Sequence, residues 1–302
     1  MLIDQIINNC DNEYRSHCSR YVCDDCQHEN ECSGGCKKCL EEIHYPSKYP
    51  NGKKDYDCSN LMNFYMCDYT FKYASEMLYL LRKSECLKDI DDYHIMSIGC
   101  GGCPDLMAFE AYVNETGNAK RIQYYGVDRN NLWKPIHQDI DSYCRNCTTN
   151  MRASFAYKDA IDYFNEKTIR GTNVIVIQYL ISHLYNTNQI LKINSFYDSM
   201  IQNIIKYRQT NKPCVILIND VNSCYRGRSY FLNLRDKLSE NDLHGLASMY
   251  YFNYNIQNEQ QRYGTPHTSN NILFDIPKDF ECYEPWKVCS SAQLLIEIKK
   301  EG

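Results

Sequence analysis

Residues 94–105 of this 302-residue chain read HIMSIGCGGCPD. The first six form a short apolar run that predicts a buried β-strand, and Pro104 suits the first turn of a helix. Glycines at positions 99, 101 and 102 allow the backbone to turn sharply and to approach a ligand where a Cβ would clash. The free N–H groups at the start of the helix add a positive dipole end. A strand, a glycine turn and a helix in this order indicate a nucleotide-binding α/β unit.

The rest of the chain repeats this alternation of strands and helices. From Leu61 to Leu81 a large side chain recurs every fourth residue, which predicts an amphipathic helix packed against a larger body. Repeated β–α units predict a mostly parallel sheet with helices on both faces. The last two strands have no clear helix between them, so we expect an antiparallel pair at one edge, joined by a long loop at 257–291. The expected strands are 94–99, 121–128, 151–159, 173–180, 214–220, 249–256 and 292–299, and the later helices are 104–117, 132–146, 161–167, 190–204 and 230–240.

A second motif, GVDRN, ends the expected strand 121–128. Its Asp128 follows the glycines by roughly 20–30 residues, where an acidic residue of Rossmann-like folds accepts hydrogen bonds from ribose hydroxyls. The glycines are spaced G-x-G-G from Gly99, and Cys103 stands where a third glycine is common. In SIGCGGCPD, YYGVDRN, YKDAIDYF and NVIVIQYLISHL the chain resembles the class I S-adenosylmethionine-dependent methyltransferases, over roughly residues 60–302.

This resemblance implies an α/β, Rossmann-like, mostly parallel sheet with an antiparallel last strand, and S-adenosylmethionine as cofactor. The acidic residue that often opens the family's glycine motif is replaced by Ser97. The acidic or proline–aromatic tetrad of amino-methylating DNA enzymes is missing after strand 173–180, which argues against a DNA-base substrate. By position, the resemblance assigns the methionine part to Gly99, Cys100 and Gly101, the ribose to Asp128, the adenine to Asp159 and Ala160, and the wall beside the sulfonium to Gln178.

Polar residues that follow the later strands are candidates for the acceptor side of the site. His183 follows the most apolar strand and is a candidate base, although a capping or core histidine fits the pattern too. Asp220 follows the next strand and is a second catalytic candidate. Four basic residues would favour an anionic or phosphate-bearing acceptor, unless they are ordinary solvated loop charges; they are Arg226, Arg228, Arg262 and His267.

The N-terminal residues are dense in cysteine: seven of the chain's 18 cysteines lie before residue 40. Pairs spaced C-x2-C let two thiolates reach one ion, which predicts zinc or a [4Fe–4S] cluster. The spacing is similar to the auxiliary-cluster segment of radical-SAM maturases, but no barrel pattern follows, so radical chemistry is rejected. His17 or His28 could replace a thiolate, whereas the pairs Cys100/Cys103 and Cys144/Cys147 are interpreted as coincidental. The predicted ligands are Cys18, Cys23, Cys26, Cys32, Cys36 and Cys39.

We therefore expect two parts: a cysteine-rich metal-binding module with its linker at 1–55, and a methyltransferase-like domain at 56–302. The net charge of -5 attracts no polyanion by default, no apolar run approaches the roughly 20 residues that span a bilayer, and the N-terminus lacks a signal-peptide pattern, so a cytoplasmic chain is expected. The acceptor is a small molecule or macromolecule of unknown identity, and the cysteine module could also bind a protein partner. Two rival functions stay open, a non-catalytic binding or assembly factor and an NAD(P)-dependent oxidoreductase.

Overall fold

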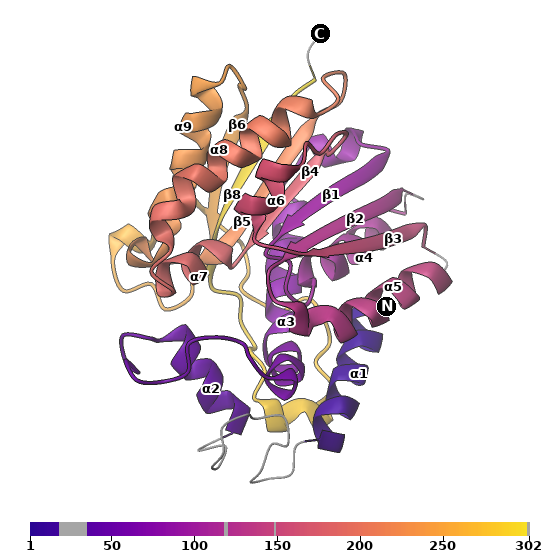
Figure 1. Cartoon of the computed structure of the whole chain (residues 1–302), viewed down its shortest axis with the longest axis vertical. Coiled ribbons are helices and arrows are strands. Elements are labelled where there is room, and N and C mark those ends of the chain that lie inside the picture. The colour runs from indigo at the N-terminus through magenta and orange to yellow at the C-terminus, as the bar shows by residue number, and fades with distance from the viewer. Residues whose placement is uncertain (18–34, 118–119, 148, 301–302) are drawn as a thin grey trace.

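The computed structural model describes residues 1–17, 35–117, 120–147 and 149–300. Its centre is an eight-stranded sheet with the strand order β3-β2-β1-β4-β5-β8-β6-β7 (Figure 1). Strands β1 to β5 pair in parallel, and β8 runs antiparallel between β5 and β6. The strands are β1 (Asp92–Ile98), β2 (Arg121–Asp128), β3 (Met151–Tyr157), β4 (Val174–Gln178), β5 (Cys214–Val221), β6 (Leu246–Tyr251), β7 (Thr265–Pro266) and β8 (Ser291–Ile298).

This order confirms the predicted fold class, an α/β, Rossmann-like, mostly parallel sheet with an antiparallel last strand. The antiparallel last strand does not form the outer edge, because β8 inserts between β5 and β6. Every residue of β8 is buried, as is expected of a strand covered on both faces. The two-residue strand β7, paired with β6, had no signal in the sequence.

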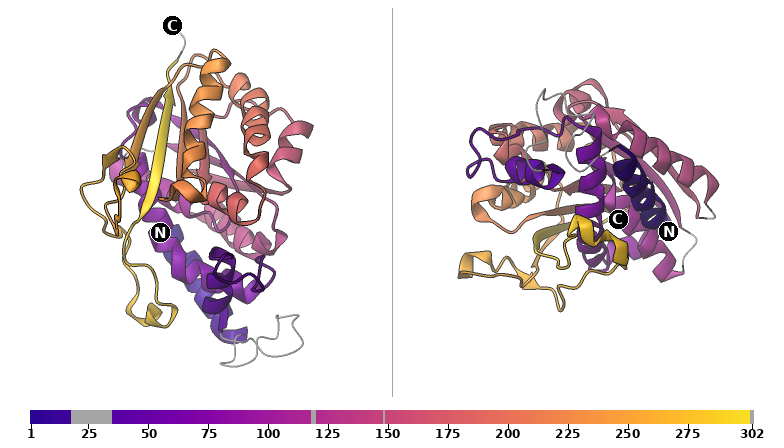
Figure 2. Two further views of the ribbon diagram at one scale, coloured as in Figure 1. Left: turned by 90° about the vertical axis from the view of Figure 1, so that its left-hand side faces the viewer. Right: turned by 90° about the horizontal axis from the view of Figure 1, so that it is seen from below.

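Helices cover both faces of the sheet (Figures 1 and 2). One apolar core lies under α3, α4 and α5, and the other under α6, α8 and α9. The helices are α1 (Leu2–His17), α2 (Gly35–His44), α3 (Ser59–Leu81), α4 (Pro104–Thr116), α5 (Lys134–Asn146), α6 (Ala160–Glu166), α7 (Leu180–Asn186), α8 (Ile193–Asn203) and α9 (Phe231–Glu240). Short 3-10 turns are η1 (Cys86–Asp89), η2 (Asn131–Trp133), η3 (Ile190–Lys192), η4 (Ile205–Tyr207), η5 (Cys224–Arg226), η6 (Arg228–Tyr230), η7 (Glu259–Gln261) and η8 (Lys278–Tyr283).

Helix α1 belongs to the same core as the main domain. Its apolar stripe Leu2, Ile3, Ile6, Ile7 and Cys10 is at most 2% exposed and joins the cluster under α3 and α4. The backbone N–H of Leu2 also donates to the Glu110 carboxylate in α4, at 2.7 Å. The boundary at residues 55/56 stays a prediction, but described residues on both sides of it share one core.

Helix α3 is buried on almost all sides, whereas the predicted amphipathic helix would have had one buried face and one exposed face. It runs past the carboxyl ends of the strands, and the segment before β8 crosses it (Figure 1). Backbone N–H groups of that segment bond to it, Leu273 to the Ser75 hydroxyl at 2.8 Å and Trp286 to the Asp68 carbonyl at 3.2 Å. Polar residues of α3 are therefore enclosed and must find partners inside the protein. Among the described residues, no helix is long and apolar enough to cross a membrane.

Candidate functional site

A cavity of ≈ 890 Å³ opens at the carboxyl ends of the parallel strands, bounded on its far side by α2 and α3. This is the edge of an open α/β sheet where ligands bind. Eight of the predicted site residues line it, namely Gly99, Gly101, Asp128, Asp159, Ala160, Gln178, His183 and Arg226.

The glycine turn wraps around the end of β2. Gly99 and Gly101 have φ angles of 68° and 49°, which only glycine adopts without strain. The Gly99 N–H donates to the Val127 carbonyl at 2.8 Å, and the Gly101 N–H donates to the Asp128 carboxylate at 2.9 Å. The predicted turn is therefore present, and its amides bind the protein's own β2 end.

The Cys100 side chain does not line the cavity, contrary to the position assigned to it by resemblance. It is 5% exposed and points beneath the turn, with its Sγ 3.9 Å from Nε2 of His137 in α5. Cys103 also lies beneath the turn and adopts a left-handed φ of 60° before Pro104 starts α4. Burial alone would raise the pKa of the Cys103 thiol, but the Cys100 hydrogen bond and the His137 ring lower it overall.

Asp128 ends β2 with both carboxylate oxygens engaged by backbone. Oδ2 accepts from Gly101 N–H at 2.9 Å, and Oδ1 accepts from Asn130 N–H at 2.8 Å. Burial raises the pKa of Asp128, and these two N–H bonds oppose the shift. A carboxylate oxygen can accept two hydrogen bonds, so Asp128 retains acceptor capacity on its cavity side.

Asp159 and Ala160 present an acceptor beside a donor. Asp159 caps the N-terminus of α6, and its Oδ1 accepts from the Ile161 N–H at 2.9 Å. Ala160 is the first residue of α6, so its N–H has no partner within the helix. A carboxylate next to a free amide suits a ligand edge that offers one donor and one acceptor.

Gln178 is the last residue of β4, and only the nitrogen of its side-chain amide has a hydrogen-bond partner among the described residues. Its Nε2 donates to the Tyr73 carbonyl at 2.8 Å, while Oε1 is buried and has no hydrogen-bond partner among the described residues. The next residue, Tyr179, has a φ of 55°, and its ring stacks on Tyr73 with centroids 3.9 Å apart. The left-handed backbone turns this ring back against α3.

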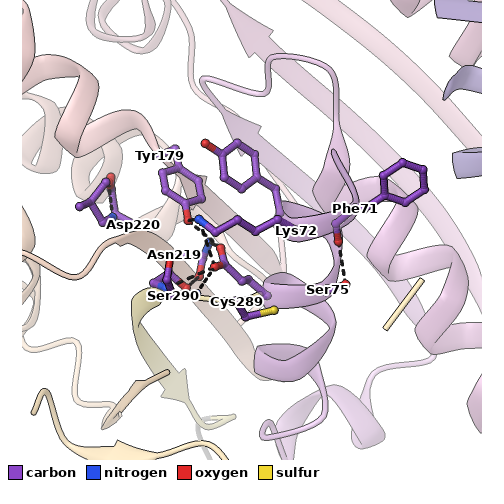
Figure 3. A network of polar contacts seen from close by, with 12 residues as sticks. Phe71, Lys72, Ser75, Tyr179, Asn219, Asp220, Cys289 and Ser290 are labelled. Carbon is purple, nitrogen blue, oxygen red and sulfur yellow. Dashed lines mark hydrogen bonds and ion pairs between the residues drawn. The ribbon is translucent and has the colours of Figure 1, made fainter. Parts of the chain in front are cut away.

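A buried polar network fixes Tyr179 beside the cavity (Figure 3). The Tyr179 hydroxyl donates to Oε2 of Glu76 at 2.7 Å and accepts from the Lys72 ammonium at 2.9 Å. Glu76 is wholly buried and also accepts from Asn219 Nδ2 at 3.1 Å and from the Ser290 N–H at 2.8 Å. The network ties α3 to the ends of β4 and β5 and to the start of β8.

Aromatic rings form the wall contributed by α3 and its neighbours. The Lys72 ammonium lies 5.1 Å from the ring centroids of Tyr179 and Trp286, in cation–π geometry. The sequence analysis missed Lys72 and this wall, because large side chains at every fourth residue of α3 equally fit a helix face packed against a core. The tyrosine and tryptophan rings that line the cavity are Tyr45, Tyr56, Tyr65, Tyr69, Tyr73, Trp133, Tyr179 and Trp286.

His183 and Arg226 line the cavity too, and their roles at an acceptor site stay a prediction. His183 is partly buried beside Tyr56, with ring centroids 6.3 Å apart, and burial lowers its pKa so that it is neutral at pH 7. The Arg226 guanidinium lies over the Tyr45 ring at 5.0 Å and donates to the His44 carbonyl at 3.5 Å. Among the described residues, no carboxylate pairs with Arg226.

Asp220 does not face the cavity, which corrects its assignment as a catalytic candidate. Its side chain is fully buried, and Oδ2 accepts from the backbone N–H groups of Ile181 at 2.9 Å and Ser182 at 3.1 Å. Burial raises the pKa of Asp220 to about 6 against the effect of these bonds. The residue satisfies the first amides of α7 and is a helix cap.

Arg228, Arg262 and His267 also lie outside the cavity lining, so they do not form the predicted basic surface. Arg228 is buried and donates to the Asn222 side chain and the Gln260 carbonyl, both at 2.5 Å. Arg262 is exposed and forms an ion pair with Glu259 of η7 at 3.0 Å. His267 is buried under β6, where its Nε2 lies 2.7 Å from Oε1 of Gln293.

Most of the predicted metal ligands cannot be placed. Cys18, Cys23, Cys26 and Cys32 lie outside the described residues, as does His28. Cys36 and Cys39 lie in α2, with Cys36 buried and Cys39 partly buried. The metal site of the N-terminal segment therefore stays a prediction.

Comparison with known proteins gave similarity of fold only. No protein-family model and no curated protein matches the sequence. Among solved structures, the plantazolicin methyltransferase BpumL in complex with SAH is 13% identical and has a TM-score of 0.44, over 88% of this chain and 98% of that one. A SAM-dependent methyltransferase from Archaeoglobus fulgidus is 14% identical with a TM-score of 0.38, over 74% and 94% of the two chains. A putative class I methyltransferase from Listeria monocytogenes is 10% identical with a TM-score of 0.43, over 88% and 68%. Sequence identities and TM-scores this low do not identify a function, so the evidence for function comes from the geometry of the site.

Proposed function

We propose that the protein is an S-adenosylmethionine-dependent methyltransferase. One observation carries the proposal: the ends of four adjacent parallel strands, and the turns after them, supply complementary groups to a single cavity. The glycine turn after β1 would receive the methionine part, and Asp128 after β2 would accept from the ribose hydroxyls. Asp159 and Ala160 after β3 match adenine, whose amino group donates and whose ring nitrogen accepts. Gln178 at the end of β4 would offer its Oε1, which has no hydrogen-bond partner among the described residues, beside the sulfonium.

Backbone N–H groups of the glycine turn already donate hydrogen bonds within the protein, which argues against a dinucleotide ligand. A pyrophosphate needs free N–H groups at the start of the helix. Here the Gly101 N–H donates to Asp128, the Cys103 N–H donates to the Cys100 carbonyl at 2.8 Å, and Pro104 has no N–H. An oxidoreductase that uses NAD(P) is therefore disfavoured. S-adenosylmethionine carries no phosphate and does not require these donors.

For the acceptor, we propose a planar aromatic or heteroaromatic molecule that carries an anionic group. The rings on the α3 side of the cavity offer stacking surfaces, and Arg226 has no carboxylate partner among the described residues that would compete with an anion. Methyl transfer requires mainly that the acceptor lone pair be aligned with the methyl carbon. His183, neutral at pH 7, is the candidate for removing a proton from the acceptor.

Calorimetry with S-adenosylmethionine, its demethylated product and NAD tests the cofactor. We expect micromolar binding of the first two, about -8 kcal/mol, and none of NAD. Asp128→Ala should weaken binding more than tenfold through the lost charge-assisted hydrogen bonds. Asp162→Ala, an exposed acid on α6, is the matched control and should bind normally. The assignment would be refuted if the protein bound NAD and did not bind S-adenosylmethionine.

A panel of phenols, indoles and aromatic carboxylates tests the acceptor, with formation of S-adenosylhomocysteine as the readout. Arg226→Ala should lower turnover of the carboxylates at least tenfold and leave cofactor affinity unchanged. Arg262→Ala, a basic residue outside the cavity, should leave both unchanged. Equal loss of turnover and cofactor affinity in Arg226→Ala would contradict an acceptor role. Tight cofactor binding without turnover of any acceptor would instead favour the non-catalytic binding factor.

We also retain the proposal that the N-terminal cysteines bind zinc or an iron–sulfur cluster, on the evidence of their C-x2-C spacing. Cys23→Ser should lower the metal content of protein purified anaerobically without chelator. Elemental analysis distinguishes zinc from iron, and thiolate-to-iron charge transfer would colour the protein brown. Finding neither element in the wild-type chain would refute the proposal.

A further inference from the structure

Two cysteines and a histidine converge beneath the glycine turn, on the side away from the cavity. Cys100, Cys103 and His137 are 5%, 0% and 2% exposed. One ligand atom from each lies within 4.8 Å of the others, and no other such group of three occurs in the described part of the chain. The C-x2-C pair therefore has a third partner, supplied by α5, that the sequence interpretation did not identify.

The local structure preserves the space in which the sulfur atoms lie. Gly126 in β2 faces Cys100, and a Cβ there would lie 2.8 Å from the Cys100 Sγ. His137 is held on its other side by Phe155, whose ring is stacked parallel to the imidazole at 3.9 Å and 9°. The three side chains are thus fixed by packing from β2, β3 and α5, which suits a rigid coordination site.

The surroundings of His137 match those of a metal-binding imidazole. Its Nδ1 lies 3.1 Å from the Tyr157 hydroxyl, a partner that can orient the ring while Nε2 faces the thiols. Nε2 also lies 2.7 Å from the Gly101 carbonyl, which in turn lies 3.7 Å from the Cys103 Sγ. Two sulfurs, one nitrogen and one carbonyl oxygen therefore surround one point.

We propose that Cys100, Cys103 and His137 bind one zinc ion beneath the glycine turn, with the Gly101 carbonyl at the fourth position. Two thiolates, a neutral imidazole and Zn²⁺ have no net charge, so the ion can be buried without an unpaired charge. An iron–sulfur cluster requires four protein ligands, usually thiolates, and only two thiols are present here. Zinc binding releases one proton from each of the two thiols. The single proton of the neutral imidazole moves from Nε2 to Nδ1, where the Tyr157 hydroxyl oxygen can accept it.

The ion would join the glycine turn to α5 without blocking the cavity. Gly99 and Gly101 line the cavity, whereas Cys100 and Cys103 do not. The zinc would hold the turn in shape on one side while a ligand binds on the other. This inference goes beyond the proposed methyl transfer and holds whichever ligand the cavity receives.

Zinc stoichiometry of the full chain tests the site. To remove the competing N-terminal thiols, the six residues Cys18, Cys23, Cys26, Cys32, Cys36 and Cys39 are replaced by serine. This variant, purified in reductant without chelator, should retain one zinc per chain, and adding Cys103→Ser or His137→Gln should remove it. Cys144→Ser is the control and should retain the zinc, because buried Cys144 belongs to a C-x2-C pair that forms no such group of three with a histidine.

If the six-serine variant does not fold, the same comparison is made in the wild-type background, where Cys103→Ser should lose one equivalent and Cys144→Ser none. Cobalt replacement gives a second readout, since Co²⁺ with two thiolates in a tetrahedral site produces an intense d–d spectrum. Cys103→Ser should abolish this spectrum in the six-serine variant and weaken it in the wild-type background, where the N-terminal thiols would also bind cobalt. Equal zinc content in wild type and Cys103→Ser, or a cobalt spectrum unchanged by the substitution, would overturn the proposal.

Discussion

Replacement of Glu76 by glutamine tests the buried network that holds α3 against the site. The carboxylate accepts from Ser290 N–H and Ser291 N–H through Oε1, and from Tyr179 OH and Asn219 Nδ2 through Oε2 (Figure 3). An amide keeps the size of the side chain but has only one acceptor oxygen. Whichever way it is oriented, one of the two donor pairs loses its acceptor.

The expected loss of stability follows from these contacts. Two hydrogen bonds to a charged acceptor contribute about 1.5–3 kcal/mol each, and breaking a buried charged pair costs about 3–5 kcal/mol. Lys72, whose ammonium lies 3.4 Å from Glu76, also loses its counter-charge. We therefore expect Glu76→Gln to lower the free energy of unfolding by about 3–5 kcal/mol, a fall in Tm of about 6–10 °C at roughly 2 °C per kcal/mol for a chain of this size.

Thermal and urea unfolding followed by circular dichroism measure this loss. Glu115→Gln is the matched control, because Glu115 forms an exposed ion pair with Arg82 and such pairs contribute less than about 1 kcal/mol. A Tm shift for Glu76→Gln no larger than that of the control would refute the reasoning, since it would mean that the four donors find other acceptors.

Three further predictions concern residues around the cavity. Asp220→Ala should lower the urea midpoint by an amount equivalent to about 1–2 kcal/mol through loss of the α7 cap, and Asp220→Asn should recover most of it; equal losses would contradict a capping role. Burial, helped by the positive charges of neighbouring residues, lowers the pKa of His44 to about 4. The unfolded chain then binds more protons between about pH 4 and 6.5, so stability should fall by about 3 kcal/mol as the pH drops through that range, and His44→Gln should abolish this share of the pH dependence. Gly126→Ala should cost about 1–3 kcal/mol, because the added methyl would meet the Cys100 sulfur at 2.8 Å; a Tm equal to wild type would show that the turn can yield.

Much of the cavity wall formed by the strand ends could be predicted from short stretches of sequence. The run 94–105 contains its own strand, turn and helix start, because apolar runs, glycine and proline act on the backbone locally. Parallel strands bring their carboxyl ends to one edge, so Asp128 and Gln178 could be assigned to the same cavity without knowing any contact between them.

The acceptor side could not be predicted in the same way. Asp220, Arg228 and His267 carry the residue types expected of a site, yet each is buried and bonded elsewhere. A polar residue near a strand end can face the ligand or cap a neighbouring element, and the sequence pattern is the same in both cases. Lys72 shows the opposite outcome, a charged residue within a buried helix that lines the cavity.

The sequence alone thus determined the order of the main strands and the glycine turn after β1, because both depend on contacts among neighbouring residues. Only the tertiary structure decided which polar groups surround the cavity. Buried Glu76 takes its partners from Asn219, 143 residues away, and Ser290, 214 residues away. Cys100 likewise meets His137 only because α5 folds back over the turn. A buried polar group must be satisfied by whatever donors or acceptors the fold brings to it, and those partners leave no mark at its own position in the sequence.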